Sequence, residues 1–173
     1  NKMGLVGSMS IYENLLLKSE TDSKFGSGNG LLLNWNAIKA HAEALREKYD
    51  IRCFGVDQPS GQLSGGNQQK TVIGKWMETK PSIFIMDSPT VGIDIGSKAE
   101  IYQQIHSLAT DGMAFILISD EAEEILANCN KVLILQDGSI KTVLDEEDLE
   151  KPDARETILD IVGSKEEKNI ERV

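Results

Sequence analysis

The sequence predicts an α/β fold in which crossover helices join the strands of a parallel sheet. Its second half alternates unbroken apolar runs of strand length with amphipathic segments, and runs that are apolar throughout are typical of strands buried on both faces. The composition is that of a globular domain, since 40% of the 173 residues are hydrophobic and 27% are charged. We expect one domain's worth of core at this length.

The first half of the chain is predicted to be mainly helical. A short helix is expected at 11–17, followed by a polar, glycine-rich surface loop at 18–30. Between 34 and 49 apolar residues recur every three or four positions, which predicts an amphipathic helix. A short extended piece at 51–54 and a turn at 57–61 follow.

The second half is predicted to alternate helices with strands. Helices are expected at about 66–77, 99–108 and 120–127, and strands at 83–86, 113–118 and 131–135. The Asp-Gly pair at 137–138 predicts a tight turn into a last strand at 140–144, so that the final two strands form a hairpin at the sheet edge. The charged remainder is expected to be helical near 155–162 and frayed at its end.

Charge, cysteine content and hydropathy exclude several kinds of function. The net charge is -10, so nucleic acid is not an expected partner. Cys53, Cys129 and two histidines give too few ligands for a structural zinc site, and we expect both cysteines to be buried small residues. No apolar run approaches the ~20 residues of a membrane-spanning helix, and no signal peptide is apparent, so a soluble cytoplasmic chain is expected.

The segment Leu63-Ser-Gly-Gly-Asn-Gln-Gln-Lys predicts an anion site at the start of a helix. Ser64 is a good N-cap, and Gly65 and Gly66 let backbone amides approach a ligand closely. The helix that begins at about Gly66 directs its positive dipole end toward that point. For Ser-Gly-Gly taken alone, the structural alternative is a capped helix after a glycine turn.

A second segment, Ile83-Phe-Ile-Met-Asp-Ser-Pro-Thr, ends a predicted buried strand with Asp87. Open α/β sheets bind ligands at the carboxyl ends of their strands, and an aspartate there can hold Mg²⁺ beside nucleotide phosphates. The structural alternative is an aspartate that begins a turn before Pro89.

Together with Gly92-Ile-Asp, these segments closely resemble the signature loop, Walker B strand and D-loop of ABC-type ATPases, in order and spacing. LSGGNQQK, PTVGIDIGSKAEIY and DGMAFILIS further resemble the C-terminal nucleotide-binding domain in the tandem ATPase of ribose- and galactose-type sugar importers. The resemblance covers about residues 4–144. It implies a P-loop NTPase-like fold, ATP hydrolysis coupled to sugar import, and ATP with Mg²⁺ as cofactors of the full-length protein.

The resemblance also implies roles for individual residues. Asp87 would hold Mg²⁺, while Ser88 and Asp120 take the positions of the catalytic base and of the switch histidine. The residues that would contact ATP are Ser64, Gly65, Gly66, Asn67, Gln68 and Asp94.

The sequence departs from the family's pattern at the phosphate loop, GxxxxGK[ST]. Its Gly74-Lys75 pair is followed by Trp76 and lies inside a predicted helix. Because the chain starts at Asn1 with neither a strand nor a capped helix, we expect it to be a piece of a longer protein whose phosphate loop lies upstream of residue 1. The sheet is then expected to be incomplete, with exposed faces.

Two further departures affect catalysis. Ser88 replaces a glutamate that acts as general base, and such a base is worth ~10²–10⁴-fold in rate. Asp120 replaces the switch histidine with a carboxylate that would repel the γ-phosphate, and it is also expected to be the N-cap of the next helix. The acidic residues that begin this helix, Glu121, Glu123 and Glu124, are expected to be solvated.

The leading hypothesis is a fragment of the energy-coupling ATPase of a sugar-type ABC importer. Its LSGGN would act in trans on ATP held by the second nucleotide-binding domain, upstream in the same chain, while its own site is degenerate and the fragment alone inactive. The other expected partners are membrane permease subunits, at the cytoplasmic face of the membrane. The alternatives are the C-terminal ATPase lobe of an SMC-type protein and a nucleotide-free interaction module.

The same resemblance divides the chain into three parts. Residues 1–66 would form part of a helical subdomain with the signature loop, 67–145 the α/β core with Walker B and the D-loop, and 146–173 a charged C-terminal tail.

Overall fold

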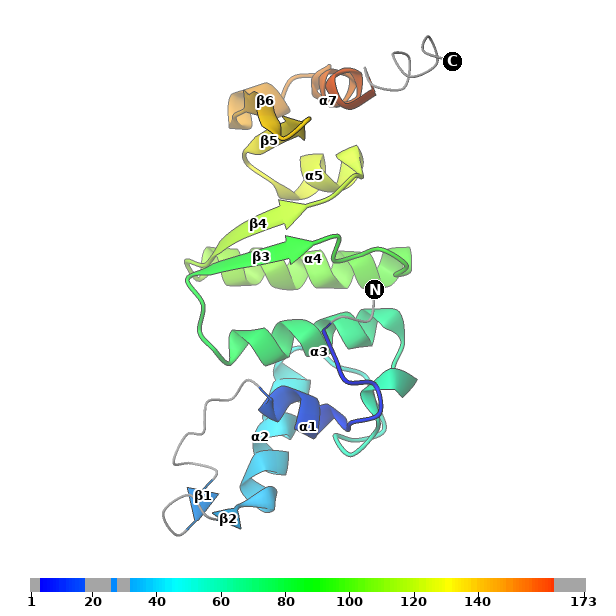
Figure 1. Ribbon diagram of the computed structural model, residues 1–173, viewed down its shortest axis with the longest axis vertical. Helices are drawn as coiled ribbons and strands as arrows, with labels where there is room; N and C mark the ends of the chain where they lie inside the picture. The colour runs from blue at the N-terminus through cyan, green and yellow to red at the C-terminus, as the bar shows by residue number, and fades with distance from the viewer. Residues whose placement is uncertain (1–3, 18–25, 28–31, 164–173) are drawn as a thin grey trace. The chain divides into compact units, whose positions relative to one another are not determined.

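The computed structural model describes residues 4–17, 26–27 and 32–163, and helices alternate with strands between residues 65 and 136 (Figure 1). The α/β class predicted from the sequence is confirmed. The helices are α1 (Ile11–Leu16), α2 (Trp35–Lys48), α3 (Gly65–Met77), α4 (Ile95–Thr110), α5 (Ala122–Asn128), α6 (Glu146–Leu149) and α7 (Ala154–Gly163), with a 3-10 turn at Ser60–Gln62. The strands are β1 (Gly26–Ser27), β2 (Leu32–Leu33), β3 (Ile83–Asp87), β4 (Ala114–Ile118), β5 (Val132–Gln136) and β6 (Ser139–Leu144).

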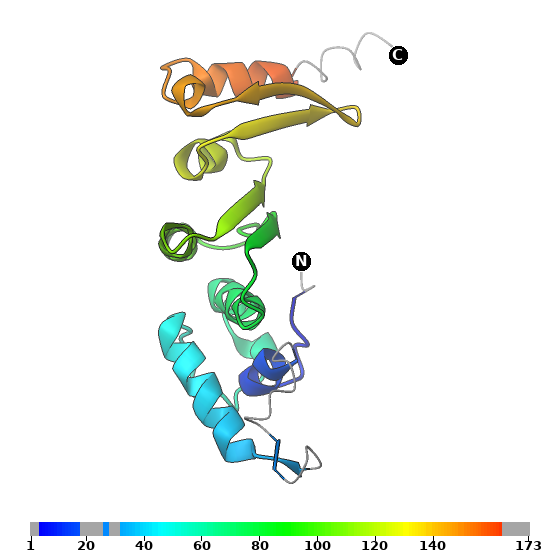
Figure 2. The same ribbon diagram turned by 90° about the vertical axis from the view of Figure 1, so that its left-hand side faces the viewer.

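The strands of the described part form three pairs, β1 with β2, β3 with β4, and β5 with β6. Strands β3 and β4 run in the same direction, and the chain passes from one to the other through α4 (Figures 1 and 2). This is the strand–helix–strand connection that the alternating pattern predicted.

The chain divides into two compact units. The first comprises the chain up to Phe84 together with Pro89–Ile116, and the second comprises Ile85–Ser88 together with the chain from Leu117 onward. The predicted three-part division at residues 66 and 145 differs from these two units and stays a prediction.

The core of the first unit lies between α1, α2 and α3. On α2 the predicted apolar face is buried at Ile38, Ala42 and Leu45, whereas Trp35 is 51% exposed at its start. Helix α1 begins with a capping box in which Ser10 and Glu13 exchange hydrogen bonds. The buried residues of α1 and of α2 lie on one face of each helix, as the 3.6-residue period of an amphipathic helix requires.

Asn14 is a fully buried polar residue in this core. Its side-chain nitrogen donates to the carbonyl oxygen of Ser10 at 2.9 Å and to the hydroxyl of Ser60 at 3.1 Å, and its oxygen accepts the N–H of Val6 at 2.8 Å. Because buried polar groups are costly unless they are paired, Asn14 fixes the segment before α1 against the 3-10 turn.

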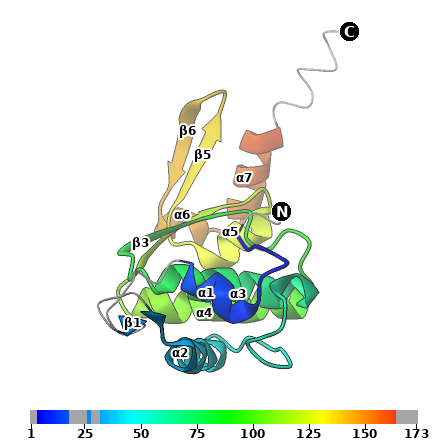
Figure 3. The same cartoon turned by 60° about the horizontal axis from the view of Figure 1, so that its bottom comes forward.

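The second unit has its own core, formed by buried side chains of α5, the β5–β6 hairpin and α7, and Figure 3 shows these elements. Residues alternate along β5, so that Val132 and Ile134 are buried while Leu133 and Leu135 are exposed. The hairpin turns at Asp137 and Gly138, whose φ angles are +52° and +74°, as a two-residue turn of this type requires. The predicted hairpin is confirmed, but among the described residues β5 and β6 form a sheet of their own and are not the edge of the β3–β4 sheet.

The structure corrects two of the predicted elements. No strand forms at 51–54, where the chain instead makes bends after α2. Most of the predicted surface loop at 18–30 lies outside the described residues, but Gly26–Ser27 form β1 and pair with β2. The predicted frayed end likewise lies outside the described residues, from 164 onward.

Several burial predictions are also corrected. Cys53 and Cys129 are only partly buried, because both lie in irregular segments beyond helix ends. Strands β3 and β4 are not buried on both faces, since four isoleucines are about half exposed or more: Ile83, Ile85, Ile116 and Ile118. Exposure of this kind was the expectation for an incomplete sheet. None of the helices in the described ranges is both long and apolar enough to span a bilayer.

Candidate functional site

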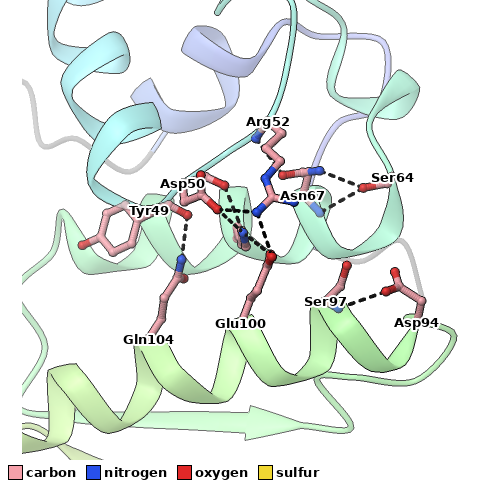
Figure 4. A network of polar contacts seen from close by, with 10 residues as sticks. Tyr49, Asp50, Arg52, Ser64, Asn67, Asp94, Ser97, Glu100 and Gln104 are labelled. Carbon is pink, nitrogen blue, oxygen red and sulfur yellow. Dashed lines mark hydrogen bonds and ion pairs between the residues drawn. The ribbon is translucent and has the colours of Figure 1, made fainter.

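The turn that starts α3 presents the hydroxyl group of Ser64 at the surface (Figure 4). Its oxygen accepts the backbone N–H of Asn67 at 3.4 Å, which confirms the predicted N-cap, and the side-chain nitrogen of Asn67 at 2.8 Å. A hydroxyl group has two acceptor sites and one proton. With both acceptor sites used, the Ser64 proton is available to an exposed acceptor such as an anion.

Gly65 and Gly66 have different structural roles. A Cβ on Gly66 would lie 2.5 Å from the Cβ of Ser97, so close packing of α3 against α4 requires glycine there. A Cβ on Gly65 would lie at ordinary contact distances, 3.6 Å from the carbonyl oxygen of Gly92 and 3.7 Å from Ile93. The local packing therefore does not require glycine at position 65. The absence of a side chain there leaves space for a ligand.

Asp94 follows the Gly92 turn and immediately precedes α4. Its carboxylate accepts the backbone N–H of Ser97 at 3.0 Å and is the N-cap of the helix. Hydrogen bonds from the backbone and the side chain of Ser97 hold the pKa of Asp94 below its usual range. The sequence placed Asp94 among ligand-contacting residues, and the structure adds this capping role.

Behind the signature turn lies an ionic cluster that the sequence analysis did not identify. We call it the Lys70 cluster, formed by Lys70, Asp50, Arg52 and Glu100 (Figure 4). Lys70 is 1% exposed, and its ammonium donates to Glu100 at 2.7 Å and to the carboxylate and the carbonyl oxygen of Asp50, each at 3.0 Å. All three of its protons are therefore paired, as burial of a charge requires.

The Lys70 cluster changes the titration of its carboxylates. The hydrogen bond from Lys70, and then its charge, holds the pKa of Glu100 below the ordinary value. The same hydrogen bond is the main cause of the lowered pKa of Asp50. Both carboxylates are consequently ionised at neutral pH. Their ion pairs with Lys70 link α3 to α4 and to the turn after α2.

Asp87 and Ser88 belong to the second unit and stand at the end of β3. Asp87 is the last residue of the strand and is exposed, as predicted. The Ser88 hydroxyl donates to the Asp87 carboxylate at 3.0 Å, and the Ser88 N–H donates to the carbonyl oxygen of Ile118 at 2.9 Å. Ser88 has φ +49°, a left-handed conformation that is uncommon for a residue with a Cβ.

Asp120 is exposed, but the prediction that it caps the next helix is wrong. Helix α5 begins at Ala122, so the N-cap position falls on Glu121. The hydroxyl of Ser119 accepts the Glu121 N–H at 3.1 Å and donates to Glu124. Glu124 is buried rather than solvated, and this hydrogen bond offsets part of the cost of its burial.

The Gly74-Lys75 pair lies inside α3, as predicted. The Lys75 ammonium donates to the carbonyl oxygen of Gly4 at 2.9 Å. Over the described ranges no group of three or more His, Cys, Asp or Glu side chains is placed to hold a metal ion.

Known proteins similar in sequence are import ATP-binding proteins. The chain is 40% identical over 148 residues to the ribose import ATP-binding protein RbsA of Jannaschia sp. (strain CCS1), an alignment that covers 86% of this chain and 28% of that protein. It is 44% identical over 135 residues to ribose import ATP-binding protein RbsA 1 of Agrobacterium fabrum, covering 78% and 26%. The chain thus spans about a quarter of the length of these relatives. No family model matches the sequence.

Known structures show the same fold. A nucleotide-free ATP-binding cassette from an ABC transporter superposes with a TM-score of 0.67 at 22% identity, over 88% of this chain and 60% of that one. A second ATP-binding cassette of an ABC transporter has a TM-score of 0.70 at 22% identity, over 90% and 63%. The chain therefore has the fold of part of an ABC transporter ATP-binding cassette, and its sequence is similar to those of ribose import ATP-binding proteins, as its motifs indicated.

Proposed function

We propose that the chain works as part of the ATP-hydrolysing, energy-coupling subunit of a sugar-type ABC importer. The names of its relatives and its cassette fold support this role. They also favour it over the SMC-type lobe and over an interaction module without nucleotide. The activity and the sugar belong to the whole protein, of which we propose that this chain is a fragment.

Within that protein, the LSGGN segment contacts ATP held by a partner nucleotide-binding domain upstream in the same chain. The observation that carries this proposal is the Ser64 hydroxyl, whose proton is available at the exposed N-terminal end of α3. A γ-phosphate placed there would accept that proton and face the positive end of the helix. Asn67 and Gln68 lie at the start of α3, and Asp94 is the N-cap of α4.

The chain's own ATP site is proposed to be degenerate. A bound Mg²⁺ would supply charge neutralisation of the phosphates, and the exposed Asp87 fits one ligand position, since the Ser88 hydroxyl bonds to only one of its carboxylate oxygens. Ser88 itself is a donor to Asp87 and cannot act as a base near neutral pH. Without the missing phosphate loop the 173-residue chain alone is expected to be inactive.

Permease subunits are the proposed membrane partner, and the inner face of the membrane is the proposed location. In such a complex ATP hydrolysis at the unequal sites would drive sugar import.

The test is ATP turnover by the full-length protein. Ser64→Arg and Gly65→Asp should each abolish most turnover, because either side chain occupies the space of the incoming phosphate. Gly65→Asp is informative because the local packing accommodates a Cβ at this position. Near-wild-type hydrolysis by both variants would show that LSGGN is only a capped turn.

A further inference from the structure

The side-chain amide of Asn67 has both of its ends in use (Figure 4). Its oxygen accepts the backbone N–H of Arg52 at 2.7 Å, and its nitrogen donates to the hydroxyl oxygen of Ser64 at 2.8 Å. A backbone N–H can only donate, so the amide oxygen has to face Arg52. This fixes the amide nitrogen, and not the oxygen, on Ser64.

The direction of this contact decides where the Ser64 proton points. If an acceptor faced Ser64, the hydroxyl would donate inward to it. Because a donor faces it, the hydroxyl oxygen acts as an acceptor on this side and its proton turns away from Asn67.

The anchor of Asn67 is itself held in place. The Arg52 guanidinium donates to Glu100 at 2.8 Å and to Asp50 at 3.2 Å. Both carboxylates are bound by the buried Lys70. The backbone N–H of Arg52 is thus fixed by the Lys70 cluster, although the Arg52 side chain is largely exposed.

We propose that Asn67 is a positioning residue that holds the Ser64 hydroxyl proton toward the bound phosphate. The proposal rests on the proposed function of the LSGGN segment. Asn67 acts through Ser64, and its own side chain faces the protein on both sides.

Two variants of the full-length protein separate this role from simple anchoring. Asn67→Asp keeps the shape and still accepts the Arg52 N–H, but it draws the Ser64 proton inward. Asn67→Leu is uncharged and removes both contacts. If Asn67 orients Ser64, both variants should lower ATP turnover about tenfold or more, since a hydrogen bond to an ionic phosphate is lost.

Each variant is then measured again in the Ser64→Ala background. The loss caused by Asn67→Leu should shrink to less than about twofold there, because no hydroxyl remains to be oriented. Asn67→Asp should keep only the smaller loss that its negative charge causes beside a phosphate.

Asn34→Asp is the matched control. Asn34 also caps a helix of the first unit, and its side chain accepts the N–H of Ala37 at 3.1 Å. The substitution adds the same charge away from α3 and should leave turnover unchanged, while thermal unfolding verifies that all variants are folded.

Three results would overturn the proposal. Wild-type turnover of Asn67→Asp would reduce Asn67 to an anchor for Arg52. Equal losses with and without the Ser64 hydroxyl would show that Asn67 does not act through it. Unchanged turnover of Ser64→Ala alone would remove the proposed function of the signature segment, and this inference with it, so the two failures are distinguishable.

Discussion

The buried ammonium of Lys70 lies 2.7 Å from the carboxylate of Glu100, so a charge pair joins the signature helix to the helix that follows the Gly92 turn. With Asp50 as a second acceptor, the ammonium is fully paired inside the first unit. The contact links two segments that are 30 residues apart in the sequence.

This pair predicts a loss of stability in acid. Lys70 lowers the pKa of Glu100 and of Asp50, so the unfolded chain binds more protons than the folded chain at acid pH. Their stabilisation is therefore present above the ordinary carboxyl pKa values and is lost as pH falls through the lowered ones. Thermal unfolding from pH 6 down to about pH 3 should show a decline in Tm that is shallower in Glu100→Gln. Parallel curves for the two proteins would contradict this.

Removal of the Lys70 charge should destabilise the protein. We expect Lys70→Met to lower the free energy of unfolding by about 2 kcal/mol. This is less than the roughly 3–5 kcal/mol lost when one partner of a fully buried ion pair is removed, because the two partner carboxylates can regain water. Lys39→Met is the control, since Lys39 pairs with Asp57 at the surface and should cost less than about 1 kcal/mol. Denaturant unfolding measures the loss of stability in each variant. Equal losses in the two variants would show that the burial of Lys70 does not set the size of the effect.

The two signature glycines should respond differently to alanine. Gly66→Ala should cost about 1–3 kcal/mol, because the new methyl group collides with Ser97. Gly65→Ala should be neutral or stabilising, since the position is helical and open. Urea denaturation of the two variants compares them directly, and a larger loss at Gly65 would be the contrary result.

The chain's own ATP site should tolerate the loss of Ser88. In the full-length protein Ser88→Ala should lower turnover by less than about twofold, because a group that gives no transition-state stabilisation has none to lose. Ser88→Glu should not by itself restore a second active site while Asp120 remains. A hundredfold decrease in Ser88→Ala, on the order of a lost catalytic group, would assign this serine a catalytic role.

The elements set by local periodicity were predictable from the sequence. The apolar spacing of α2, the cap at Ser64 and the Asp137–Gly138 turn each depend on residues only a few positions apart. The Lys70 cluster was not predictable, because a lysine in a helix is ordinarily solvated and its partners come from distant segments. The misplaced cap at Asp120 has another cause, since acidic residues occur in succession there and any of them can begin the helix.

Asn14 has a consequence for the order in which the molecule folds. Helix α1 has only six residues, too few to be stable alone, and Asn14 meets Ser60 across 46 positions of chain. That long loop has to close before the contact can form, whereas α2 is built from neighbours in sequence. We therefore expect α1 to become native late, and during synthesis its contact with Ser60 cannot form until residue 60 has left the ribosome.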